Sequence, residues 1–143
     1  MGWRSIIFGL AVLTACEDAT GPYDPEVRNA ILVKDVDEVT WLHSVWNDMQ
    51  RCSGLTGSIP FVKISFYSVP GPFFQYDTLD VIGLWDGARR QIYISHLETN
   101  PVWTVKHEIM HALLYPIHGH PPEWFVTGPC GDLITGTPNG SSP

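Results

Sequence analysis

The chain has 143 residues, a formal net charge of −7 and a hydrophobic fraction of 44%. This length fits one domain with one core, and this hydrophobic fraction excludes general disorder. The acidic balance argues against a nucleic-acid partner, since the largest basic cluster is the pair Arg89-Arg90. We therefore expect a monomeric globular protein that binds no nucleic acid.

The first sixteen residues have the features of a bacterial lipoprotein signal peptide. Arg4 supplies a positive charge, and residues 5–13 form an apolar run. That run is too short to cross a bilayer, which takes about 20 residues. It ends in Leu-Thr-Ala-Cys, which resembles the lipobox whose cysteine is lipidated and becomes the new N-terminus. The alternatives are an ordinary secretory signal and a buried strand. We predict a signal peptide over 1–16, a lipid on Cys16 and a polar tether over 17–24, which place the domain outside the cytoplasm in the bacterial cell envelope.

The sequence from 25 to 134 predicts one α+β domain. Apolar residues within 36–52 recur every three or four positions, which is typical of a helix packed on one face. Residues 61–67 are β-branched and aromatic, which predicts a strand. Two further apolar runs, 81–85 and 91–95, flank an Asp-Gly pair and predict a hairpin. The last residues, 135–143, are rich in Gly, Pro and Ser and predict a disordered tail.

The clearest chemical signal lies on a second helix, predicted over 101–115 and ended by Pro116. This helix contains the motif HExxH, from His107 through Glu108 to His111. Residues four apart share one helix face, so both imidazoles can bind one ion at about 2.0–2.1 Å. Glu108 follows His107 directly, so its side chain points to one side of the ion rather than at it. There its carboxylate can act as a general base.

A simpler explanation of the same residues is a solvent-facing polar stripe. In that case Glu108 pairs with Lys106 or His111 and binds no metal. The remaining residues between Thr104 and Leu113 are uncharged, so the motif makes up almost the whole charged stripe. This pattern favours a metal site.

The run Thr104–Leu113 resembles the active-site helix of the zincin metallopeptidases. The order of elements before it, a helix, an antiparallel sheet, a last edge strand and then the motif helix, is similar to the upper subdomain of that family. The resemblance implies one bound Zn²⁺, hydrolysis of peptide bonds and an edge strand that binds the substrate backbone. The matching edge strand is the segment Gln91, Ile92, Tyr93, Ile94 and Ser95.

The clan of zincin is not resolved by the motif. Leu114 and Ile117 stand where the metzincin pattern HExxHxxGxxH has its Gly and its third His, and no Met follows the motif. The gluzincin pattern takes its third ligand from a Glu on a later helix, and Glu123 is the only candidate, at an unusually short distance in sequence.

The third zinc ligand must come from the segment that follows the motif helix. We favour His120, because Gly119 permits a sharp bend before it and Pro121 restricts its backbone to an extended form. His118, Glu123 and a two-histidine site completed by water remain alternatives.

Two cysteines, Cys52 and Cys130, remain in the mature chain. Outside the cytoplasm such a pair favours a disulfide over two free thiols. Neither cysteine belongs to a CxxC motif, which disfavours a cysteine zinc site.

The sequence as a whole predicts a lipid-anchored, extracytoplasmic zinc peptidase with a peptide or protein substrate. One alternative is a zinc hydrolase of a non-peptide or cell-wall substrate. Another is a non-catalytic zinc-binding lipoprotein, whose site would have four protein ligands and no open position.

Overall fold

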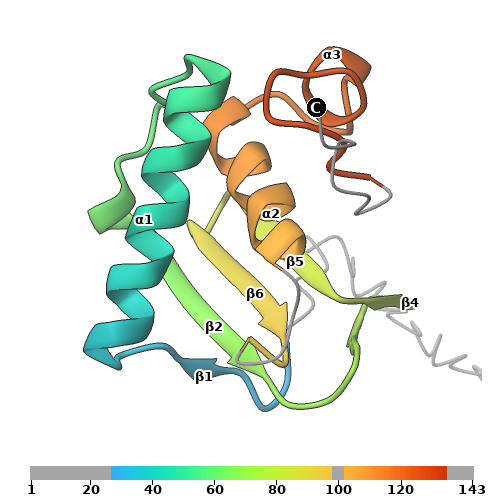
Figure 1. Ribbon diagram of the computed structural model, residues 1–143. Coiled ribbons are helices and arrows are strands. Elements are labelled where there is room, and N and C mark those ends of the chain that lie inside the picture. The colour runs from blue at the N-terminus through green and yellow to red at the C-terminus, as the bar shows by residue number, and fades with distance from the viewer. Residues whose placement is uncertain (1–26, 98–101, 135–143) are drawn as a thin grey trace, which may run out of the picture.

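The computed structural model describes residues 27–97 and 102–134. The predicted signal peptide, Cys16, the tether and the predicted tail lie outside the described residues. Two helices, α1 and α2, lie across one face of a small mixed sheet, and a short third helix follows α2 (Figure 1). The fold class is α+β, as predicted.

Helix α1 spans Val36–Ser53 and confirms the first predicted helix. It begins at Asp35, whose side chain accepts hydrogen bonds from two backbone N–H groups of the first turn. It ends at Gly54, which takes the left-handed conformation (φ 73°) and so closes the last turn. Its buried face points at the sheet and at α2, and consists of Leu42, Val45, Trp46 and Met49.

The sheet has the strand order β1-β2-β6-β5. Its strands are β1 (Ile31–Leu32), β2 (Ser65–Val69), β5 (Gly83–Asp86) and β6 (Gln91–Ser95). Strands β2 and β6 are parallel, whereas β1 and β5 each run antiparallel to their neighbour. A separate hairpin joins β3 (Phe74–Tyr76) to β4 (Leu79–Val81).

The prediction that residues 91–95 form an edge strand is wrong. Strand β6 is paired on both sides, with β2 and with β5, so the edge of the sheet near α2 is β5. The alternating side chains of β6 agree with a central position. Ile92 and Ile94 lie in the core under the helices, while Tyr93 lies in a second apolar cluster on the opposite face.

Two predicted strand boundaries also differ from the structure. Residues Phe61–Lys63 form a 3₁₀ turn rather than a strand, because the N–H groups of Lys63 and Ile64 donate to the carbonyls of Pro60 and Phe61, each at 2.9 Å. Val81 belongs to β4, so the hairpin of β5 and β6 is shorter than predicted and its turn spans residues 87–90.

Helix α2 spans Val102–Leu114 and carries the HExxH motif. The predicted first residue of this helix, Pro101, lies outside the described residues. The buried side of α2 packs against α1 and the sheet through Val105, Ile109, Met110, Ala112 and Leu113. The short helix α3 follows at Pro122–Phe125.

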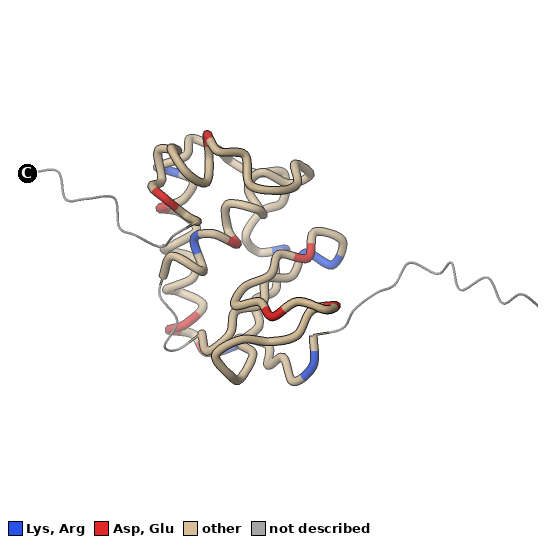
Figure 2. The backbone as a smooth tube through the Cα atoms, turned by 90° about the vertical axis from the view of Figure 1, so that its right-hand side faces the viewer, with Lys and Arg blue, Asp and Glu red and all other residues tan. Residues whose placement is uncertain are grey.

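Within the ranges 27–97 and 102–134, no helix has both the length and the hydropathy needed to cross a membrane. The basic residues in these ranges are spread over several parts of the fold, apart from the pair Arg89-Arg90 in the turn between β5 and β6 (Figure 2).

The predicted disulfide is present and joins Cys52 at the end of α1 to Cys130 after α3. The two Cα atoms are 5.2 Å apart, and 78 positions separate the residues in sequence. Closing so long a loop restricts the unfolded chain strongly.

We expect the double substitution Cys52→Ser/Cys130→Ser to lower the free energy of unfolding by up to about 4 kcal/mol, measured by urea titration. A chain carrying only Cys16→Ser serves as the reference, and it should show no free thiol when denatured without reductant. Two free thiols in that reference chain would contradict the bridge.

Candidate metal centre

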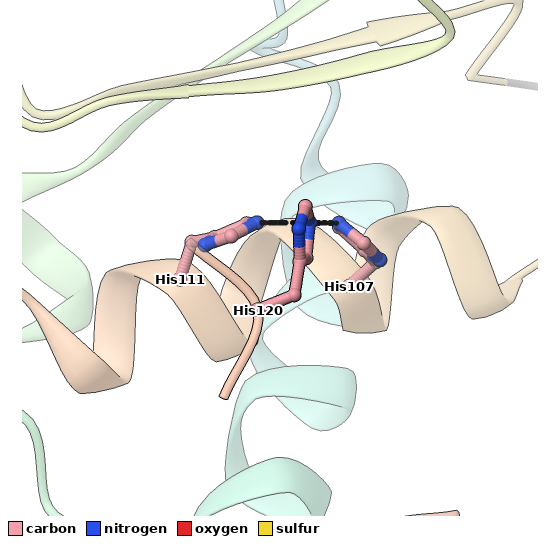
Figure 3. Close-up of side chains that lie close together, drawn as sticks. All are labelled: His107, His111 and His120. Atoms are coloured by element: carbon pink, nitrogen blue, oxygen red, sulfur yellow. Dashed lines mark hydrogen bonds between the residues drawn. The ribbon is translucent and has the colours of Figure 1, made fainter. Parts of the chain in front are cut away.

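Three histidine side chains converge on one point beside α2. The Nε2 atoms of His107 and His111 are 3.2 Å apart, those of His111 and His120 are 3.2 Å apart, and those of His120 and His107 are 2.9 Å apart. The rings turn these nitrogens toward one another, two from α2 and one from the segment that crosses in front of it (Figure 3). The structure therefore brings His107, His111 and His120 close enough to bind one metal ion.

The turn after α2 explains how His120 reaches the other two rings. The N–H of Ile117 donates to the carbonyl of Leu114 at 2.9 Å, which closes the helix. Gly119 then takes a positive φ of 79°, a conformation that a residue with a Cβ rarely adopts. Pro121 follows in an extended conformation and leads into α3.

The donor set fits a divalent transition metal. Two nitrogens that bind a tetrahedral ion at about 2.0–2.1 Å lie about 3.3–3.4 Å apart, close to the separations found here. His107 Nδ1 is 2.6 Å from the carbonyl oxygen of Leu133. A carbonyl only accepts, so Nδ1 carries the proton and the Nε2 lone pair faces the other two rings.

Burial keeps the two α2 imidazoles neutral, which is the state that binds a metal. Desolvation, together with the smaller effect of the neighbouring His107 and His120, lowers the pKa of His111 to about 3. Desolvation also lowers the pKa of His107, against the opposing effect of its hydrogen bond to the Leu133 carbonyl.

Glu108 is a buried carboxyl, with only 6% of its surface exposed. Burial raises its pKa to about 8, while a backbone hydrogen bond from Trp85 acts in the opposite direction. The side chain lies against Gly83 of β5, where an added Cβ would be 2.5 Å from Oε1. The absence of a side chain at Gly83 therefore makes room for Glu108.

The histidines and Glu108 share a cavity of about 310 Å³. The first three residues of β5 form one wall, α2 forms another, and the loop after α2 forms a third. The lining residues are Gly83, Leu84, Trp85, His107, Glu108, His111, Ile117, His118, Gly119 and His120.

The two alternative ligands lie outside the three-histidine cluster. His118 lines the cavity but is not among the three nitrogens that converge. Glu123 is exposed on α3 and does not line the cavity. No residue of β6, the predicted substrate-binding strand, lines the cavity either; the strand that borders it is β5.

Three groups at this site were missed in the sequence. They are Gly83, which makes room for Glu108, the Leu133 carbonyl, which orients His107, and Phe125, whose ring packs against all three histidines. A glycine inside the apolar run 81–85 was a weak signal for the first. The other two depend on the folded path of the chain and have no local pattern.

The metal-free protein should lose stability as the pH rises above about 6.5. Between the unfolded pKa of 4.5 and the folded pKa of about 8, Glu108 keeps its proton only in the folded state, so its effect on stability is increasingly unfavourable as pH rises. His111 has the opposite effect between pH values of about 3 and 6.5, where it is protonated only in the unfolded chain, so the free energy of unfolding rises with pH there. Above pH 6.5 His111 makes no further change to the stability.

With a chelator present, the free energy of unfolding should therefore fall from pH 6.5 to pH 8 by up to about 2 kcal/mol. Urea titrations at the two pH values measure the fall. Glu108→Gln should abolish it, and an unchanged fall in that variant would show that another group is responsible.

No protein-family model, curated protein or solved structure gives a significant match to this chain. Its function is therefore inferred from its own residues and their geometry.

Proposed function

We propose that the protein is a zinc-dependent peptidase of the zincin type. The observation that carries this proposal is the convergence of His107, His111 and His120 in one cavity with the buried carboxyl of Glu108. A stripe of solvent-facing residues would leave the third histidine elsewhere and the carboxyl in water. In this α+β domain the helix that carries HExxH packs against a small mixed sheet, which also agrees with a zincin-like fold.

The donor set favours a transition metal, and we propose zinc because the two α2 histidines belong to an HExxH motif. Three imidazoles suit zinc and other transition metals, whereas carboxylate and carbonyl oxygens would suit magnesium or calcium. Three protein ligands beside a cavity leave a fourth position open, which is the arrangement of catalytic rather than structural zinc sites. When bound, zinc supplies Lewis acidity, which polarises a carbonyl and lowers the pKa of a water to about 7.

Glu108 is placed to move the proton. Its carboxyl is one residue from His107 and lines the same cavity. A carboxylate there can accept a proton from the attacking water and deliver it to the nitrogen of the leaving amine. Because a nearby positive charge lowers a carboxyl pKa, metal binding would bring the raised pKa of Glu108 back toward a value suited to a base at neutral pH.

Strand β5 is the best candidate to hold the substrate backbone. It pairs only with β6, so in the described part of the sheet its other edge has no strand partner. Leu84 and Trp85 of this strand line the cavity. An extended peptide could add to the edge through main-chain hydrogen bonds and bring one peptide bond beside Glu108.

We propose that the protein acts at the cell envelope, anchored by a lipid on Cys16. The support is the lipobox-like end of the apolar run. In a bacterial host, the wild type should partition into detergent with the membrane fraction and a Cys16→Ser chain should not. Equal partitioning of the two would argue against the lipid.

The test of the activity is cleavage of a peptide library with and without a chelator. We expect cleavage at internal or terminal peptide bonds, its loss when a chelator is added, and its return with added Zn²⁺. Cleavage that survives complete removal of metal would contradict the mechanism. Hydrolysis of cell-wall peptides or non-peptide amides, with library peptides left intact, would keep the zinc chemistry and reject the proposed substrate.

A further inference from the structure

The segment after His120 contacts the histidine cluster at two separate places. Phe125, at the end of α3, is fully buried. Its ring centroid lies 5.0 Å from that of His107, 4.6 Å from that of His111 and 4.8 Å from that of His120. One phenyl ring therefore touches all three candidate ligands and offers no donor atom of its own.

The second contact is the carbonyl of Leu133, which accepts the hydrogen bond from His107 Nδ1. Leu133 is only 2% exposed. Its N–H donates to the carbonyl of Phe125 at 2.8 Å, so the segment folds back on itself. The Phe125 ring, which packs against the three histidines, and the Leu133 carbonyl, which accepts from His107, thus belong to the same short segment, residues 125–133.

The disulfide ties this segment to the core of the protein. Cys130 lies three residues before Leu133, and its partner, Cys52, lies in the last turn of α1. Between Phe125 and Leu133 the chain has little regular structure, with one turn closed by the N–H of Gly131 on the carbonyl of Gly128 at 3.1 Å. The disulfide is thus a covalent restraint on the chain three residues before the Leu133 carbonyl.

We propose that residues 125–133, held by the Cys52–Cys130 disulfide, are a positioning segment that sets the geometry and metal affinity of the three-histidine site. Phe125 limits the rotation of the three rings from one side. The Leu133 carbonyl holds the proton of His107 on Nδ1 and so directs Nε2 at the ion. Partners of this kind typically change metal affinity by about 10- to 100-fold when they are removed. The inference rests on the proposed metal centre but does not require peptidase activity.

The first test is Phe125→Leu, which keeps an apolar residue but removes the ring. We expect the Kd for Zn²⁺, measured by competition with a coloured chelator, to rise by about 10- to 100-fold. The matched control is Phe74→Leu, the same change at a buried phenylalanine in the second apolar cluster. The control should stay within about threefold of the wild type.

The second test is Cys52→Ser/Cys130→Ser, which leaves every side chain that contacts the histidines in place. We expect a similar rise in Kd for Zn²⁺, together with faster solvent exchange of the His107 Nδ1 proton observed by NMR. Val69→Ala controls for lower stability, since Val69 is buried in the second cluster away from the site. That variant should unfold more easily and yet keep its Kd and its slow-exchanging ring proton.

The possible outcomes separate the positioning role from the peptidase activity. Wild-type affinity in both Phe125→Leu and the disulfide variant would overturn the positioning role and leave the metal centre standing. Weakened binding in both, in a protein that cleaves no peptide, would support the positioning role and count against the peptidase. A wild type that binds neither Zn²⁺ nor Co²⁺ would overturn the metal centre and the positioning role together.

Discussion

Replacing Glu108 with Gln should leave the metal in place and lower peptide hydrolysis by at least about 100-fold. The amide has nearly the shape of the carboxyl, so it fits the same space against Gly83. It cannot accept the proton from the attacking water, and general acid–base catalysis is lost. Because Glu108 is not one of the three converging ligands, the affinity for zinc should change little.

The measurement pairs steady-state hydrolysis with metal analysis of the dialysed variant. Glu123→Gln is the matched control, since the same change falls on an exposed residue of α3 outside the cavity. That control should keep nearly full activity. If Glu108→Gln instead lost its zinc, Glu108 would be a ligand and its assignment as a base would be wrong.

His120→Ala should abolish metal binding. Removing one of three imidazoles opens the site to water, so we expect zinc to be lost on dialysis and hydrolysis to fall to background. Of the three candidate ligands found among the described residues, His120 is the one that lies outside α2.

His118→Ala is the control that distinguishes the candidate ligands. His118 lines the cavity two residues before His120 but lies outside the converging set. Isothermal titration with Zn²⁺ should give a Kd close to that of the wild type for this variant and no measurable binding for His120→Ala. The reverse result would make His118 the third ligand.

Local sequence patterns predicted helices α1 and α2 and the disulfide correctly, whereas the short helix α3 was not predicted. Helix α1 has a capping Asp, a regular apolar face and a terminal Gly, all of which act within a few residues of one another. The HExxH spacing likewise brings His107 and His111 together on any helix. His120 was predicted from Gly119 and Pro121, and the positive φ of Gly119 agrees with that reasoning.

The order of the strands could not be predicted in the same way. The turn between β5 and β6 indicated that these strands pair, but it did not say which one meets β2. That choice depends on a parallel pairing between segments far apart in sequence, and Tyr67 opposite Tyr93 has no local signal. The contacts of Phe125 and Leu133 with the histidines were missed for the same reason, since both form only when the chain after α2 returns to that helix.

The most direct test of the central claim is X-ray absorption at the zinc edge, combined with the zinc content of the protein purified without added chelator. We predict one zinc per chain, bound by three imidazole nitrogens at about 2.0–2.1 Å and by one exchangeable oxygen ligand. His120→Ala should lose the signal under the same conditions. A protein without zinc, or a zinc bound by four protein ligands or by sulfur, would contradict the account.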